Sequence, residues 1–162
     1  ELAPDQAAVL DAVVLTPPSF TFTSAATVTF GGTAVEMRHL GRGHTDNDIV
    51  ISLPDRNVLF AGDLIEEGAS PSFNDSFPLD WPVTLEALLP LAGGAVVPGH
   101  GATVDHAFVT RQLDELQIVA RLARERFANG ITPEVAAEMS GPYTPQVLAG
   151  AFLRAWRQLE AS

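Results

Sequence analysis

The order of two periodicities constrains the fold of this chain more than any other feature of its sequence. Short β-prone runs separated by turn residues occupy its first part, at Phe20–Thr23, Thr27–Phe30, Ala34–Leu40, Ile49–Leu53 and Val58–Ala61. Beyond Asp105, apolar residues from Val109 to Phe127 instead recur at the spacing of an amphipathic helix. We therefore expect a β-meander over about residues 20–61 and a helical tail over about 106–160.

Shorter signals predict the elements between and around these two regions. Thr132-Pro133 and Thr144-Pro145 are each typical of a helix cap followed by proline in the first turn. These two pairs predict tail helices that end near Met139 and Leu159. Local patterns elsewhere predict helices over residues 5–14 and Thr84–Leu91 and a strand at Ala95–Val97. The expected fold is α/β, a single unit over residues 1–162 in which helices pack on one face of a mixed, mostly antiparallel sheet.

Composition excludes several classes of function. The chain has no cysteine, so disulfides, thiolate catalysis and cysteine-bound zinc are excluded. Its formal net charge of −11 disfavours nucleic acid as a partner. No apolar run is long enough to span a membrane, and no basic segment followed by an apolar one indicates a secretory signal. We therefore expect a cytoplasmic protein without a membrane partner.

Three residues of metal-ligand type each follow a β-prone run. His44 stands in Gly43-His44-Thr45, Asp63 follows Gly62, and His100 stands between Gly99 and Gly101. Loops at strand ends on a rigid sheet are common places for functional side chains. Without cysteine, zinc is held by imidazole and carboxylate, and a carboxylate can bridge two metal ions. His44, Asp63 and His100 are therefore the candidate metal ligands.

The segments GHTDNDIVI, LFAGDLI and VVPGHG resemble three consecutive motifs of the metallo-β-lactamase superfamily, in that family's order and with similar spacing. The resemblance covers roughly residues 20–128. It implies that His44 is the third histidine of a first zinc, that Asp63 bridges, and that His100 is a ligand of a second zinc. An aspartate at position 63, where the β-lactamases of the superfamily place cysteine, is more similar to the glyoxalase-II-like hydrolases.

The family's upstream histidine-rich motif, which supplies four further ligands, has no counterpart in this chain. The resemblance thus implies the C-terminal αβ half of an αββα sandwich. The missing N-terminal half, or a second copy, would cover the sheet face left open. We expect the complete protein to hydrolyse an ester, thioester or amide bond of a small-molecule substrate through zinc-bound hydroxide. We expect the isolated chain to bind zinc poorly and to be inactive.

Two other functions stay open at this point. The half-fold could be a non-catalytic dimerising or regulatory module, as the missing motif suggests. An iron-dependent relative with redox chemistry would use the same ligand types.

Other polar residues have competing interpretations. Thr45 and Asp48 either orient the metal ligands or bond the local backbone. His39, within an expected strand, and His106, at the start of the long helix, are expected to be structural. We expect Glu66 and Glu67 to be a solvated loop pair.

Overall fold

Five strands form one sheet in the computed structural model, which describes residues 12–161. They are β1 (Ala25–Phe30), β2 (Thr33–Arg38), β3 (Val50–Leu53), β4 (Val58–Glu66) and β5 (Ala95–His100). The first four strands pair antiparallel with their chain neighbours, and β5 pairs parallel with β4. The expectation of a mixed, mostly antiparallel sheet is confirmed. The helix expected over residues 5–14 lies almost wholly outside the described residues.

Three strand predictions need correction. Residues 20–23 are not a strand, because their β propensity finds no neighbouring strand with which to form a ladder. β4 continues past Ala61 to Glu66, and β5 continues past Val97 to His100. The sequence obscured both extensions because Gly62, Pro98 and Gly99 are typical of turns. In the structure they lie at irregularities where the β4–β5 register shifts.

The helices follow the predicted order. They are α2 (Trp81–Leu88), α3 (His106–Ala128), α4 (Pro133–Ala137) and α5 (Pro145–Glu160), with short 3₁₀ turns η1 (Pro54–Arg56) and η2 (Leu89–Leu91). Asp105 caps α3 by accepting a bond from the Phe108 amide at 2.9 Å. Asp80 stands at the N-cap of α2, but its side chain makes no capping bond. No helix in residues 12–161 has the length and apolarity needed to cross a membrane.

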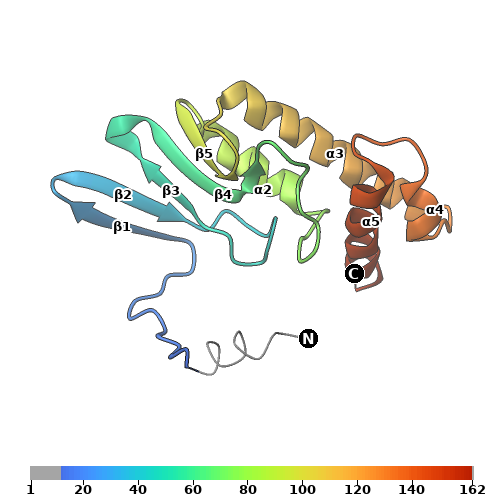
Figure 1. Ribbon diagram of the computed structural model, residues 1–162, viewed down its shortest axis with the longest axis horizontal. Coiled ribbons are helices and arrows are strands. Elements are labelled where there is room, and N and C mark those ends of the chain that lie inside the picture. Colours follow the sequence, from blue (N-terminus) through green and yellow to red (C-terminus); the bar gives the residue numbers. More distant parts are fainter. Residues whose placement is uncertain (1–11, 162) are drawn as a thin grey trace.

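The core lies between one face of the sheet and the helices, which are gathered on that side (Figure 1). From the sheet, Leu59, Ala61 and Val96 are buried, and α2 and α3 contribute Trp81 and Leu116. Burying a large side chain of this kind contributes about 1.5–3 kcal/mol. This packing fixes the edge of the sheet at which the metal-ligand candidates stand.

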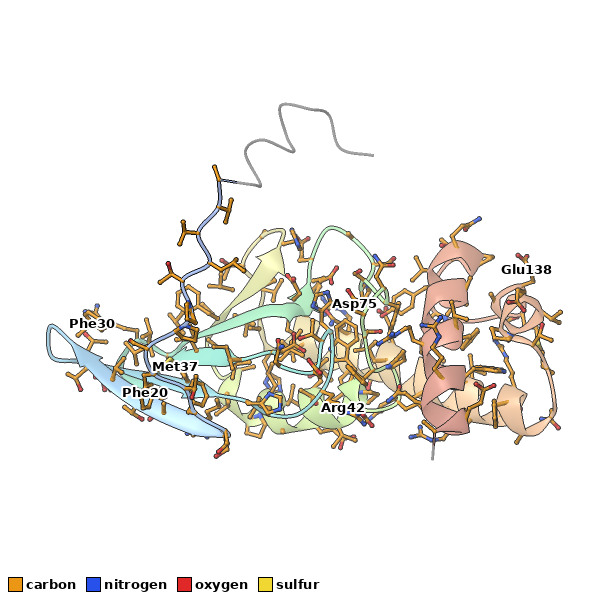
Figure 2. All side chains as sticks on the ribbon, turned by 90° about the horizontal axis from the view of Figure 1, so that it is seen from below. Phe20, Phe30, Met37, Arg42, Asp75 and Glu138 are labelled. Atoms are coloured by element: carbon orange, nitrogen blue, oxygen red, sulfur yellow. The ribbon has the colours of Figure 1, made fainter. Side chains whose placement is uncertain are left out.

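The opposite face of the sheet is apolar, and none of the helices within residues 12–161 lies on it (Figure 1). One row crosses all five strands, because Ala26 pairs with Met37, Met37 with Ile51, Ile51 with Phe60, and Phe60 with Val97. Cross-strand partners share a face. None of the five is buried, and Phe60 is 41% exposed while its neighbour Leu59 is 1% exposed. Figure 2 shows α2 below the strands and residues 12–24 approaching from above. We call these five residues the open row.

Candidate metal centre

The three candidate ligands come together although 56 positions separate the first from the last. His44 stands in the β2–β3 loop, Asp63 in β4, and His100 is the last residue of β5. The His44 Nδ1 lies 3.8 Å from Asp63 Oδ2, and the His100 Nε2 lies 3.6 Å from Asp63 Oδ1. Each imidazole therefore faces a different oxygen of the same carboxylate.

Asp63 owes its position to two glycines. Gly62 has a φ of 55°, a left-handed conformation that suits glycine, and the β4–β5 register shifts on both sides of it. Gly99 lies directly against the Asp63 side chain. A Cβ at Gly99 would stand 2.8 Å from Asp63 Cγ and collide with Oδ1. The glycine before His100 thus leaves the space that the carboxylate occupies.

The loop that carries His44 is packed onto α2 and β4. A Cβ at Gly43 would lie 2.5 Å from Leu64 Cδ2 and 3.1 Å from Trp81 Cδ1. The Phe77 amide donates to the Gly43 carbonyl at 2.8 Å. The His44 ring meets the Trp81 ring edge-on, with centroids 5.9 Å apart. These contacts hold His44 on a rigid support.

Thr45 and Asp48 bond mainly to each other. Asp48 accepts from the Thr45 amide at 2.8 Å and from the Thr45 hydroxyl at 2.7 Å. The Asp48 Oδ1 lies 3.7 Å from His44 Nδ1, which is too far for a hydrogen bond. Direct contacts therefore support the interpretation that Thr45 and Asp48 bond within their own loop. A role for Asp48 in orienting His44 stays a prediction.

The remaining histidines are placed away from this centre. His39 follows β2, and its Nδ1 donates to the Asp48 carbonyl at 3.0 Å, which ties the strand end to the His44 loop. His106 is exposed at the start of α3. Neither is paired with Asp63 in the structure.

The interpretation of Glu66 and Glu67 as a solvated pair is wrong for Glu66. Glu66 ends β4 and is only 7% exposed, and its Oε1 accepts from the Ser72 amide at 3.2 Å. Glu67 is half-buried, and its carboxylate accepts from the Ala102 amide at 2.7 Å. The strand extends past the turn-like Gly62, and this extension carries Glu66 inside.

Sequence reasoning also missed the residues that hold the end of β4. Gln112 of α3 donates to the Leu64 carbonyl at 2.9 Å and accepts from the Glu66 amide at 3.1 Å. The Trp81 indole donates to the same Leu64 carbonyl at 3.2 Å. No local pattern marks Gln112, because its partners are 46 and 48 positions away. These bonds fix the strand segment that carries Asp63.

The donor set fits part of a two-metal site. Two donors on one tetrahedral zinc, each at about 2.1 Å, lie about 3.4 Å apart. The separations of Asp63 from His44 and His100 are close to this value. Within residues 12–161, however, no three His, Asp or Glu side chains are grouped to hold a metal ion by themselves. The described part of the chain supplies donors on both sides of Asp63 and a full ligand shell on neither side.

Comparisons with known proteins concern the family and the fold of the chain. A family model described as "Metallo-beta-lactamase superfamily" matches residues 2–122. The chain is 32% identical over 99 residues to the metallo-beta-lactamase type 2 of Bacillus cereus, covering 58% of this chain and 39% of that protein. It is 35% identical over 89 residues to the type 2 enzyme of Bacteroides fragilis, covering 52% and 36%. The aligned region thus covers less than two fifths of the length of each of these curated relatives.

Solved structures show the same fold. A metallo-beta-lactamase from Pontibacter korlensis superposes with a TM-score of 0.59 at 28% identity, covering 71% of this chain and 56% of that one. A stereoselective inverting sec-alkylsulfatase from Pseudomonas sp. superposes with a TM-score of 0.73 over 88% of this chain and 26% of its own. At 15% identity, the second likeness concerns the fold alone.

Proposed function

Because this chain belongs to the metallo-β-lactamase superfamily, we propose that it forms one part of a zinc-dependent hydrolase site, with His44, Asp63 and His100 as metal ligands. One observation carries the proposal, namely that the two imidazoles stand at opposite oxygens of the Asp63 carboxylate. A carboxylate approached in this way is suited to bridge two cations.

The residues have separate roles in this proposal. Asp63 would contact both metal ions, His44 one of them and His100 the other. Bound zinc would lower the pKa of a water molecule and polarise a carbonyl oxygen. Both effects favour hydrolysis of an ester, thioester or amide. Gly99 leaves room for the carboxylate, and Trp81 supports the His44 ring. The contribution of the protein is to hold the ligands in position.

Completing the site requires donors from outside this set of three. A catalytic zinc usually has about three protein ligands. We propose that the N-terminal αβ half of the superfamily fold packs on the open row and brings the remaining donors to the same edge. The isolated chain is then expected to be inactive. Apolar surface that stays uncovered tends to associate, so a second copy of the chain is the alternative occupant.

Zinc titration of the purified chain tests the ligand assignment. We expect weak binding that is lost in His44→Ala, Asp63→Asn and His100→Ala. His106→Ala is the matched control, because this exposed histidine lies outside the site. Binding that survives removal of His100, or that disappears equally in His106→Ala, would refute the assignment.

A non-catalytic module is the second candidate function. It is favoured by the lack of any three-donor group within the described residues and by the open row, none of whose residues is buried. Elemental analysis of a complex with the N-terminal half separates the two functions. About two zinc ions per complex support the hydrolase, and no metal under excess zinc supports the module. If the complex retains iron, the result would instead support an iron-dependent relative with redox chemistry.

The substrate subclass depends on Asp63. Its carboxylate, in the position where the superfamily's β-lactamases place cysteine, favours a glyoxalase-II-like thioester or ester substrate. The similarity to type 2 metallo-beta-lactamases favours a β-lactam amide. Assays of the completed protein on a thioester and on a chromogenic cephalosporin distinguish these substrates.

A further inference from the structure

A second functional feature lies where α3, α5 and the segment before α2 meet. A hollow of about 480 Å³ there is lined by Arg42, Arg124, Arg154 and Arg157, together with Phe77 and Leu159. Four of the nine basic residues in the chain therefore line one hollow, and Asp80 is the one acidic residue among its lining. We call this the arginine pocket. Such a concentration of positive charge stands out in a chain with a net charge of −11.

Two of the guanidinium groups are held in place by the protein. Arg154 donates to the carbonyls of Ser76 and Asp75 at 2.9 and 3.0 Å. Arg42 forms an ion pair with Asp80. Both guanidinium groups also lie over the Phe77 ring, 4.5 Å from its centroid for Arg42 and 5.6 Å for Arg154. In Figure 2, Arg42 and Asp75 are labelled between the strands and α5.

The other two guanidinium groups are available to bind a ligand. Arg124 of α3 and Arg157 of α5 are both exposed, and neither side chain forms an ion pair or hydrogen bond with another residue in the described range 12–161. One carboxylate, that of Asp80, thus faces four positive charges. Like charges brought together repel, and a bound anion relieves this repulsion.

We infer that the arginine pocket binds the phosphate group of a small phosphorylated molecule. Guanidinium groups present planar forks of donors that match phosphate oxygens, and several of them suit a multivalent anion. Phe77, Leu79 and Leu159 give the hollow an apolar part that an attached organic group would contact. The pocket contains none of the three candidate metal ligands, so this inference does not depend on the proposed hydrolase site.

Calorimetric titration of the metal-free chain tests this inference, because removing metal prevents phosphates from acting as chelators. The probes are inorganic phosphate, pyrophosphate and phenyl phosphate, each compared with sodium chloride at matched ionic strength. We expect saturable binding that is tighter for pyrophosphate than for phosphate, and tighter for phenyl phosphate than for phosphate if the apolar part is contacted. No saturable binding beyond that of chloride would overturn the inference.

Two variants locate the binding. The double variant Arg124→Gln/Arg157→Gln should bind pyrophosphate about tenfold or more weakly, because charge-assisted hydrogen bonds are lost. It should melt at no lower a temperature than the wild type, since neither side chain has a partner in the described residues and the loss of two charges relieves repulsion. Arg121→Gln is the matched control, because Arg121 is an exposed arginine of α3 outside the pocket. Equal affinities for the double variant and the wild type, or an equal loss in the control, would refute binding at this pocket.

Discussion

Replacing Gly99 by alanine tests whether the Asp63 carboxylate is held where a metal needs it. The added methyl group would lie 2.8 Å from Asp63 Cγ and 2.9 Å from the Asp63 backbone nitrogen. Gly99 has an ordinary φ, so alanine meets no conformational strain at this position. The perturbation is therefore a steric push on one side chain and its backbone.

The size of the effect follows from these distances. Ordinary contact begins at about 3.4 Å, so Cγ must withdraw from 2.8 Å by more than half an ångström, and Oδ1, with which the methyl group collides, must move further. Metal–ligand distances tolerate only about 0.2 Å. Changes that merely disturb the partners of a ligand cost about 10- to 100-fold in metal affinity. We expect Gly99→Ala to lower zinc affinity by at least tenfold and stability by about 1–3 kcal/mol, as overpacking usually does.

Competition of the chain against a chromogenic zinc chelator measures the affinity, and thermal unfolding measures the stability. Gly93→Ala is the matched control, because a Cβ there meets only Asn57 Oδ1, at 3.5 Å. It also lies in the approach to β5, where its φ is ordinary. Unchanged zinc affinity in Gly99→Ala would show that Asp63 does not need its observed position.

Three further predictions concern the rest of the chain. Arg126→Met should destabilise the chain by about 3 kcal/mol in denaturant unfolding, because a buried guanidinium then no longer donates to two carbonyls, at 2.8 and 2.6 Å. Burial, and then the bond to Glu115, raises the pKa of Tyr143 above its usual 10.0, so stability should fall as pH rises past 10. Melting temperatures of Tyr143→Phe between pH 9 and 11 should fall less than those of the wild type. Phe60→Ser should reduce self-association in light scattering, whereas Val83→Ser, which changes an exposed apolar residue of α2, should not.

The sequence predicted those parts of the fold in which local pattern and tertiary packing agree. The long helix α3 begins at His106, where the helical tail was predicted to begin, because its apolar face and its cap at Asp105 both act locally. The strand predicted over residues 20–23 was wrong because a strand needs a neighbouring strand to pair with. The β propensity of a segment does not show whether such a neighbour is present. The ends of β4 and β5 were missed because Gly62 and Gly99 serve a bulge and a close side-chain approach instead of a turn.

The candidate site divides in the same way. The ligand types were visible in the sequence, and the structure brings His44, Asp63 and His100 together. Asp63, however, lies within β4 and not in a loop after it, because the strand continues to Glu66. Glu66 and Gln112 were not visible as a pair, because their bond joins β4 to α3 across 46 positions. The arginine pocket was equally hidden, since its four arginines come from three separate segments of the chain. Contacts between residues that are far apart in the chain produce no periodic pattern in the sequence.

Two of the three candidate ligands and two residues of the open row lie on the same two strands. Phe60 and Val97 lie in β4 and β5, which continue to Asp63 and His100. Consider a protein layer that covers the open row and also brings metal donors to that edge. Zinc must then raise the affinity of the layer for the chain, and the layer must raise the affinity of the chain for zinc by the same factor. A second copy carries the same three donors and is expected to cover the row without this reciprocity. Affinity for the N-terminal half should therefore rise with zinc, while self-association should not respond to it.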